Sequence, residues 1–307
     1  MTTTTPLLVA VDGSSAASAA IRYAAQEAKR LETGLQLVHV VPNYLPISPM
    51  MPLSPSDLDA PAMKILRRAA KQARTLLGSE KVTATLLHGP RVATLVDLAD
   101  DVPLVVIGSQ QRPAFERLVT GSTLVGLASR AKSPVVGVPD HWMPGEPHHR
   151  IVVGIRSAAE APDLVRRALE TGEALGASVV LLHAWELPSE YDDLLVTHGD
   201  REEWNARAHR DIDSVLAVVQ AAHPDVQVEV RVVHGQPARV LQVASRDADL
   251  LLLSRRRRAF PVGHLGGTGR ALLHHAACPV EIVAPVAEPL ETPQPGSRAG
   301  REPVEVN

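Results

Sequence analysis

Apolar residues along this chain alternate between short β-branched runs and longer stretches with helical spacing. In the first half, the short runs lie at 7–11, 35–41, 82–87, 104–107 and 134–138, and helical spacing follows at 17–31, 62–77, 90–99 and 121–131. Short apolar runs bounded by turns are typical of buried strands, and a 3–4 residue spacing is typical of helices. The order βαβαβαβαβ predicts a parallel sheet with right-handed crossovers. Residues 42–61 contain six prolines and predict a long irregular loop.

The second half of the chain repeats the first. Residues 37–40 (LVHV) correspond to 181–184 (LLHA), 88–90 (HGP) to 234–237 (HGQP), 133–136 (SPVV) to 278–281 (CPVE) and 7–9 (LLV) to 151–153 (IVV). These matches occur in order, at offsets of 144, 146, 145 and 144 residues. We therefore predict an α/β protein with two tandem doubly wound, Rossmann-like parallel sheets, each of five strands in the order 3-2-1-4-5.

The two repeats are predicted as domains at 1–139 and 151–286, joined by a linker at 140–150. The linker sequence, DHWMPGEPHHR, has two prolines and a glycine and lacks a hydrophobic period. It holds His141, His148 and His149, but the carboxylate and cysteine companions of a well-spaced metal site are missing, so we predict no metal there. The tail at 287–307 is rich in Pro and Glu and is predicted to be disordered.

Composition narrows the classes of partner. The formal net charge of −3 gives no field that would attract nucleic acid or an anionic membrane, so neither is predicted as a partner. The single cysteine, Cys278, excludes an internal disulfide framework and fits a reducing cytoplasm. The N-terminus lacks the basic and apolar segments of a signal peptide, and no apolar run reaches the roughly 18 residues of a spanning helix. We expect a cytoplasmic protein.

The candidate site lies at 105–123, which reads VVIGSQQRPAFERLVTGST. A strand ends at Gly108, a polar loop follows, and Gly121-Ser122-Thr123 opens the next helix. Strand, loop and helix N-terminus together present backbone N–H groups to an anion. In the order 3-2-1-4-5, strands 1 and 4 are neighbours at the switch point where such sheets bind ligands, so Asp12 and Ser14 should lie beside Gly108. Asp12 and Ser14 can also serve simply as turn and helix cap.

These residues make the chain resemble the universal stress protein family over roughly 5–286, in both repeats. The family's loop reads Gly-x2-Gly-x9-Gly-Ser/Thr, and members with the full motif bind ATP. The resemblance implies ATP in the first repeat, with Mg²⁺ beside it, Val40 near the adenine and the Ser122 and Thr123 hydroxyls at the phosphates. The residues it implies for the nucleotide are Val11, Asp12, Val40, Gly89, Gly108, Gly121, Ser122 and Thr123.

The middle glycine of this motif is Gln111 in the first repeat. Glycine lets the backbone approach phosphate closely and permits φ > 0. A strained glutamine would cost about 1–3 kcal/mol, or about one to two decades in Kd. A loss of this size would weaken ATP binding without abolishing it, and whether Gln111 abolishes binding is left open by the sequence.

The second repeat departs further from the motif. Arg156 replaces the acid after the first strand, Ser254 replaces the first motif glycine, and Gly267 replaces the hydroxyl residue after Gly266. Its loop is also one residue shorter than that of the first repeat. We predict that the second repeat does not bind ATP in the family's manner.

Three further features of the second repeat have structural and functional interpretations. The arginines at 255–258 suit a solvated loop, an anion site or, without aromatic interleaving, less well a nucleic-acid patch. His274 and His275 are adjacent on a helix and do not share a face, so they are interpreted as helix residues and not ligands. Cys278 is predicted to be a small buried apolar group.

Three classes of function fit these residues. The first is a binding or regulatory protein whose ATP-bound conformation is recognised by a protein partner, with at most one ATP. The second is an interaction scaffold that no longer uses nucleotide. The third is a slow ATPase, but no nucleophile–base pair occurs at motif spacing, so no catalytic residue is predicted.

The fifth strands suggest how the repeats assemble. The resemblance also implies that 134–138 and 279–283 pair across a pseudo-twofold axis as a pseudo-dimer, which would cover two sheet edges. Further homodimerisation, the identity of the protein partner and the triggering stress are left open by the sequence.

Overall fold

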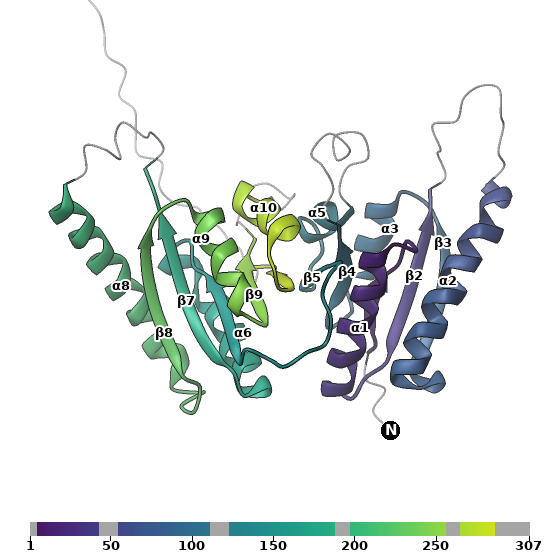
Figure 1. The fold of residues 1–307 in the computed structure, drawn as a ribbon, viewed down its shortest axis with the longest axis horizontal. Helices are drawn as coiled ribbons and strands as arrows, with labels where there is room; N and C mark the ends of the chain where they lie inside the picture. The colour runs from purple at the N-terminus through teal and green to yellow at the C-terminus, as the bar shows by residue number, and fades with distance from the viewer. Residues whose placement is uncertain (1–4, 43–54, 111–122, 188–196, 256–264, 286–307) are drawn as a thin grey trace, which may run out of the picture.

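Ten strands form one continuous sheet, built from two copies of a five-stranded unit (Figure 1). The strand order is β3-β2-β1-β4-β5-β10-β9-β6-β7-β8, so each copy has the predicted order 3-2-1-4-5. The computed structural model describes residues 5–42, 55–110, 123–187, 197–255 and 265–285. The predicted tail at 287–307 lies outside these residues.

The elements of the first repeat are β1 (Leu7–Ala10), α1 (Ser15–Arg30), β2 (Leu35–Val41), α2 (Pro55–Leu77), β3 (Val82–His88), α3 (Arg91–Leu98), β4 (Val105–Ser109), α5 (Thr123–Ala128) and β5 (Val135–Pro139). Those of the second are β6 (Arg150–Gly154), α6 (Pro162–Leu175), β7 (Ser178–Trp185), α8 (His198–Gln220), β8 (Val228–His234), α9 (Pro237–Ala244), β9 (Leu250–Ser254), α10 (Gly267–His275) and β10 (Val280–Val283). Short 3-10 turns lie at Ser79–Lys81, Ala158–Glu160 and Ser245–Asp247.

The two repeats are joined through their fifth strands, which confirms the predicted pairing. Strands β5 and β10 run antiparallel, with Val135 opposite Ile282 and Gly137 opposite Val280. The other strand pairs of the sheet, within the residues that the structure describes, are parallel. In Figure 1 the repeats form the arms of an open V that meet where α10 lies beside α5. Each repeat thereby covers one sheet edge of the other.

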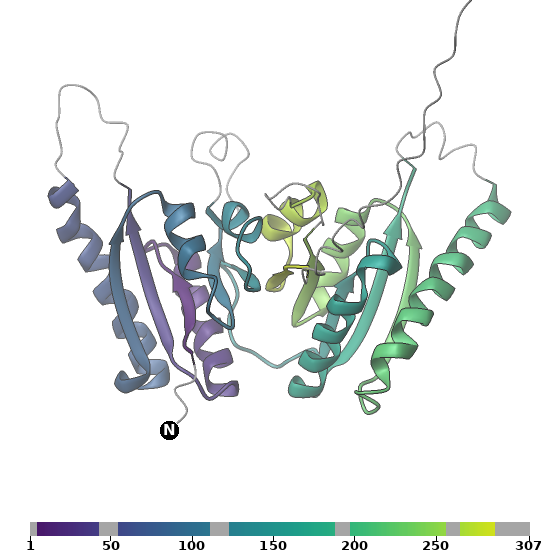
Figure 2. The same cartoon turned by 180° about the vertical axis from the view of Figure 1, so that it is seen from behind.

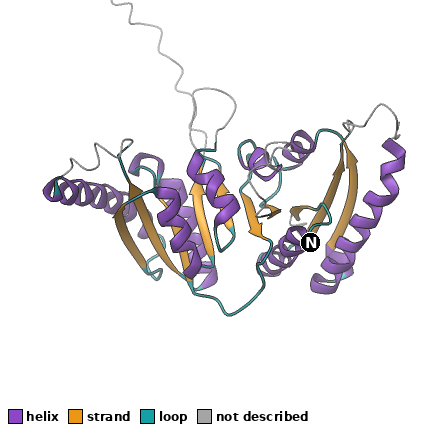
Figure 3. Ribbon diagram, turned by 45° about the horizontal axis from the view of Figure 1, so that its top comes forward, coloured by secondary structure: helices purple, strands orange, loops and turns teal. Residues whose placement is uncertain are grey.

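Helices cover both faces of the sheet, and one face has a core that both repeats share (Figures 2 and 3). Successive strand residues point to opposite faces. On one face, Leu8 of β1 and Ile282 of β10 belong to the same hydrophobic cluster, which also contains Leu127 of α5 and Leu272 of α10. On the opposite face, α1 and α2 pack in one cluster and α6 and α8 in another. The shared cluster makes the junction between the repeats an interior of the protein.

The linker is held at both ends. The Trp142 ring packs edge-on against Tyr23 of α1 at a centroid distance of 5.3 Å, and its carbonyl accepts a 2.9 Å hydrogen bond from Arg22. Near β6, the Asp249 carboxylate accepts the backbone N–H groups of His148 and Arg150 at 2.8 and 3.0 Å. These contacts fix the path of the chain from one repeat to the next.

Two predicted boundaries were wrong. Helix α2 begins at Pro55 and includes Pro61, whereas the prolines predicted an irregular loop up to residue 61. Pro55 is the first residue of the helix, where its missing N–H has no partner to lose. Pro61, the seventh residue, lies inside the helix. Helix α5 ends at Ala128 and not at 131, although the backbone N–H of Ala131 still donates to the Leu127 carbonyl.

Candidate functional site

A cavity of about 550 Å³ opens in the first repeat at the carboxyl ends of β1, β2 and β4. This is the place where the strand order reverses and where open α/β sheets bind ligands. Apolar side chains from the strands and from α2 and α3 form much of its wall, including Val38, Ile65, Leu95 and Ile107. Its size and mixed polar and apolar lining suit a small organic ligand.

Most of the predicted site residues meet at this cavity. Val11, Asp12, Val40, Gly108 and Thr123 line it. Gly89 is not among the lining residues, but its N–H donates to the Val41 carbonyl at 3.0 Å, and its φ of 145° suits glycine. Gly121, Ser122 and Gln111 lie outside the described residues.

Asp12 has a structural partner as well as a place on the cavity wall. One carboxylate oxygen accepts the Ser14 N–H at 2.9 Å, and the Ser14 hydroxyl in turn accepts the Ala17 N–H at 3.1 Å as the N-cap of α1. The turn-and-cap alternative is thus observed, yet Asp12 remains exposed and lines the cavity. Both roles fit the same side chain, because the carboxylate has a second oxygen.

Gly108 allows α1 to approach β4 closely. A Cβ atom at this position would lie 2.3 Å from the Ala16 carbonyl carbon and 2.4 Å from its oxygen. In the second repeat the register of β6 and β9 places Ser254 at this position. There α6 begins at Pro162, six residues after Arg156, whereas α1 begins at Ser15, three residues after Asp12. The second repeat thus combines a later start of its first helix with a serine side chain at the end of its fourth strand.

The histidine of the second strand has the same structural role in both repeats. Nδ1 of His39 lies 2.6 Å from the Val11 carbonyl, and Nδ1 of His183 lies 2.9 Å from the Ile155 carbonyl. Each ring ties the end of the second strand to the end of the first. His39 also lines the cavity.

Three kinds of lining residue were missed from the sequence. Leu58 and Pro61 come from the start of α2, which was predicted as loop, and Ile65 comes from the part of α2 that was predicted as helix. Arg91 opens α3 directly after the Gly89-Pro90 turn, a position that could have indicated it. His274 comes from α10 of the second repeat, and no local pattern in the sequence indicated it.

The corresponding place in the second repeat holds aromatic side chains. The strand registers align Trp185 with Val41, and Trp204 is the seventh residue of α8 as Pro61 is of α2. The two indole rings touch edge-on at 5.2 Å, and Trp185 donates from Nε1 to Asn205 at 2.7 Å. His234 packs on the same Trp185 ring at 4.6 Å. Tryptophan thus occupies the place of two lining residues of the first repeat.

Arg255, the first of the four consecutive arginines, is part of the junction and not a freely solvated side chain. Its guanidinium donates to the Ala131 carbonyl of the first repeat at 2.9 Å. Burial lowers the pKa of Arg255. Residues 256–258 lie outside the described residues.

Within the described part of the chain, no group of three or more His, Cys, Asp or Glu side chains is arranged to hold a metal ion. Cys278 is buried there as predicted, and burial raises the pKa of its thiol to about 12. Among the described helices, none has the length and apolar character needed to cross a membrane.

Comparison with known proteins gives consistent matches along the chain. The model of the universal stress protein family matches residues 3–139 and 147–284. Among curated proteins, Universal stress protein Rv1996 of Mycobacterium tuberculosis is 28% identical over 303 residues, which cover 92% of this chain and 95% of the relative. Universal stress protein Rv2005c of the same organism is 29% identical over 285 residues, covering 90% and 96%. A solved universal stress protein from Archaeoglobus fulgidus has a TM-score of 0.69 at 15% identity and covers 92% of this chain and 96% of its own, a likeness of fold.

Proposed function

The chain belongs to the universal stress protein family, and on this basis we propose that it is a regulatory protein that binds one adenine nucleotide, ATP, in its first repeat. The observation that carries the proposal is the convergence of Val11, Asp12, Val40, Gly108 and Thr123 on one cavity at the switch point of the sheet. These residues lie up to 112 positions apart in the sequence, so their meeting at a cavity is independent support for the motif.

The cavity offers suitable chemistry to each part of ATP. Val38, Val40 and Leu95 provide an apolar wall for the base. The second carboxylate oxygen of Asp12 would accept a ribose hydroxyl or hold Mg²⁺ beside the phosphates. Gly108 and Ser109 at the end of β4 and Thr123 at the start of α5 line the part of the cavity where the phosphates would lie.

The second repeat would remain without nucleotide. The Trp185–Trp204 contact occupies the place where the first repeat opens between Val41 and Pro61. Arg156 stands where the first repeat has Asp12. A ligand would have to displace two packed indole rings and the hydrogen bond to Asn205. We therefore propose one site per chain.

The proposal assigns the chain no strong catalysis. Bound ATP would stabilise one conformation of the first repeat, and a protein partner would recognise it. The nucleotide-independent scaffold is the alternative, and slow ATP hydrolysis that disappears in Asp12→Ala would support an enzyme instead. The cytoplasmic location is part of the proposal and depends on the single cysteine.

Calorimetric titration of the full chain with Mg-ATP tests the proposal. Thr123→Val keeps the shape of the side chain and removes its hydroxyl, so it should weaken binding about tenfold, the worth of one hydrogen bond to a charged group. Thr75→Val is the matched control, because that exposed hydroxyl bonds only within α2. A wild-type chain that binds no ATP would overturn the proposal in favour of the scaffold.

A further inference from the structure

We propose that the second repeat completes the nucleotide site of the first, with His274 of α10 contacting the phosphates. This inference rests on the proposed function. His274 lines the cavity, although all the other described lining residues come from the first repeat. It lies 150 residues beyond Leu124, the nearest of these in sequence. It reaches the cavity because β5 pairs with β10.

The end of α10 is fixed against the first repeat. The Ser109 hydroxyl, at the end of β4, donates to the Leu273 carbonyl, and both residues are buried. The Leu273 side chain packs over Gly137 of β5, where an added Cβ atom would lie only 2.9 Å from it. A side chain at 137 would therefore force the Leu273 side chain to shift. The residue that follows Leu273 is therefore held in one place.

His274 lies at the end of the cavity where the proposed function puts the phosphates. Ser109 lines the cavity together with Gly108 and Gln110, and its hydroxyl is the group that bonds α10. An imidazole N–H can donate to a phosphate oxygen in the neutral ring as well as in the charged ring. A carbonyl-rich helix end repels an anion. Here the Leu273 and His275 carbonyls are already bonded, to Ser109 and to Gln242 at 3.1 Å.

The neighbouring histidine provides a matched control. His275 is exposed, does not line the cavity, and its ring centroid lies 6.4 Å from that of His274. Adjacent helix positions do not share a face. His274→Ala and His275→Ala therefore remove the same group from the same helix turn, once at the cavity and once away from it.

The test is calorimetric titration of the wild type and both variants with ATP and with adenosine, which lacks phosphate. We expect His274→Ala to weaken ATP binding about tenfold and to leave adenosine binding unchanged, since one hydrogen bond to an anion is lost. His275→Ala should bind both ligands like the wild type. If His274→Ala fails to fold, His274→Leu, closer in size, is measured with the same expectation.

The outcomes separate the two proposals. Unchanged ATP affinity in His274→Ala, or an equal loss for adenosine, would overturn the phosphate contact and leave the nucleotide site in place. A wild-type chain that binds neither ligand would overturn the proposed function and this inference together.

Discussion

The Ser109 hydroxyl of the first repeat donates a hydrogen bond to the Leu273 carbonyl of the second. The strand registers align Ser109 with Arg255, and Arg255 donates in the opposite direction to the Ala131 carbonyl at 2.9 Å. Each repeat therefore sends a donor from the end of its fourth strand to a backbone carbonyl of the other. The junction between the repeats is held by polar bonds as well as by the shared core.

Replacing Ser109 tests the first of these bonds. Ser109→Ala leaves the buried Leu273 carbonyl without its donor, which should lower the free energy of unfolding by about 1–3 kcal/mol. Urea unfolding followed by circular dichroism measures the change. Ser214→Ala is the control, because that exposed hydroxyl bonds only to Arg210 within α8, and it should change stability by about 0.5 kcal/mol or less. Equal effects of the two variants would contradict the role given to Ser109.

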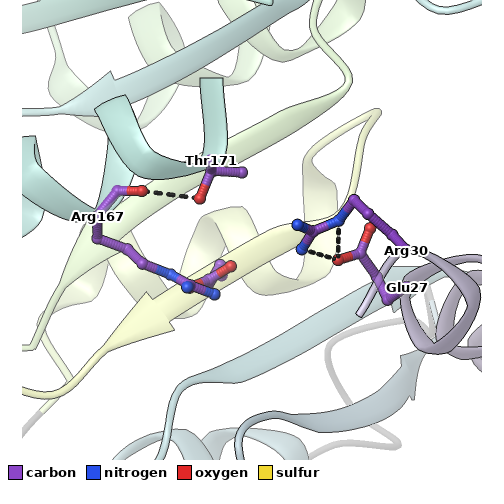
Figure 4. A network of polar contacts seen from close by, with 5 residues as sticks. Glu27, Arg30, Arg167 and Thr171 are labelled. Atoms are coloured by element: carbon purple, nitrogen blue, oxygen red, sulfur yellow. Dashed lines mark hydrogen bonds and ion pairs between the residues drawn. The ribbon is translucent and has the colours of Figure 1, made fainter. Parts of the chain in front are cut away.

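A buried ion pair at the centre of the sheet makes a second prediction. Glu281 of β10 is 2% exposed and accepts from Nε of Arg167 on α6 at 2.8 Å. Glu281 is the largest cause of the raised pKa of Arg167. Figure 4 shows Arg167, bonded through its carbonyl to Thr171, facing the Glu27–Arg30 pair of α1.

The two partners of this ion pair should respond unequally to replacement. Arg167→Met leaves a buried carboxylate unpaired and should cost about 3–5 kcal/mol. Glu281→Val copies Val136, its counterpart in β5, and should cost less because the Arg167 side chain is 32% exposed and can turn to water. The double variant should be close to Glu281→Val. Chemical unfolding of all three checks this order, and equal losses in the two single variants would refute it.

Gly108 gives a prediction about backbone approach. Gly108→Ser copies Ser254, but its Cβ would clash with the Ala16 backbone, so we expect a loss of about 1–3 kcal/mol from overpacking. Gly267→Ala is the control, since no atom of the described residues lies within 4 Å of the Cβ it would add. A Gly108→Ser chain as stable as the wild type would show that α1 can move away freely.

The pKa of Cys278 predicts a dependence on pH. Burial raises the pKa of the thiol to about 12 in the folded chain, above its ordinary value. The unfolded chain therefore loses this proton first, and the thiol's contribution to stability, full at neutral pH, should be lost as pH rises from about 9 to 12. Cys278→Ala should lose less stability over this range.

The folded wild type should also resist a thiol reagent at pH 8, and rapid reaction of Cys278 there would contradict its burial.

The sequence predicted those parts of the fold that depend on local pattern and on simple topology. Runs of Val, Leu and Ile located the strands, and the switch point brought Asp12 beside Gly108 because neighbouring parallel strands end at one edge. The start of α2 was missed because Pro55 and Pro61 favour a loop unless their place in the helix is known. His274, Trp185 and Trp204 were missed because their roles come from contacts between elements, which no periodicity encodes.

Native mass spectrometry of the full chain with Mg-ATP tests the central claim most directly. We predict one ATP per wild-type chain, and one in Trp185→Val. We predict none in Val41→Trp, which introduces into the first repeat the ring that occupies the second. A wild-type chain that carries two ATP molecules, or none, would contradict the account.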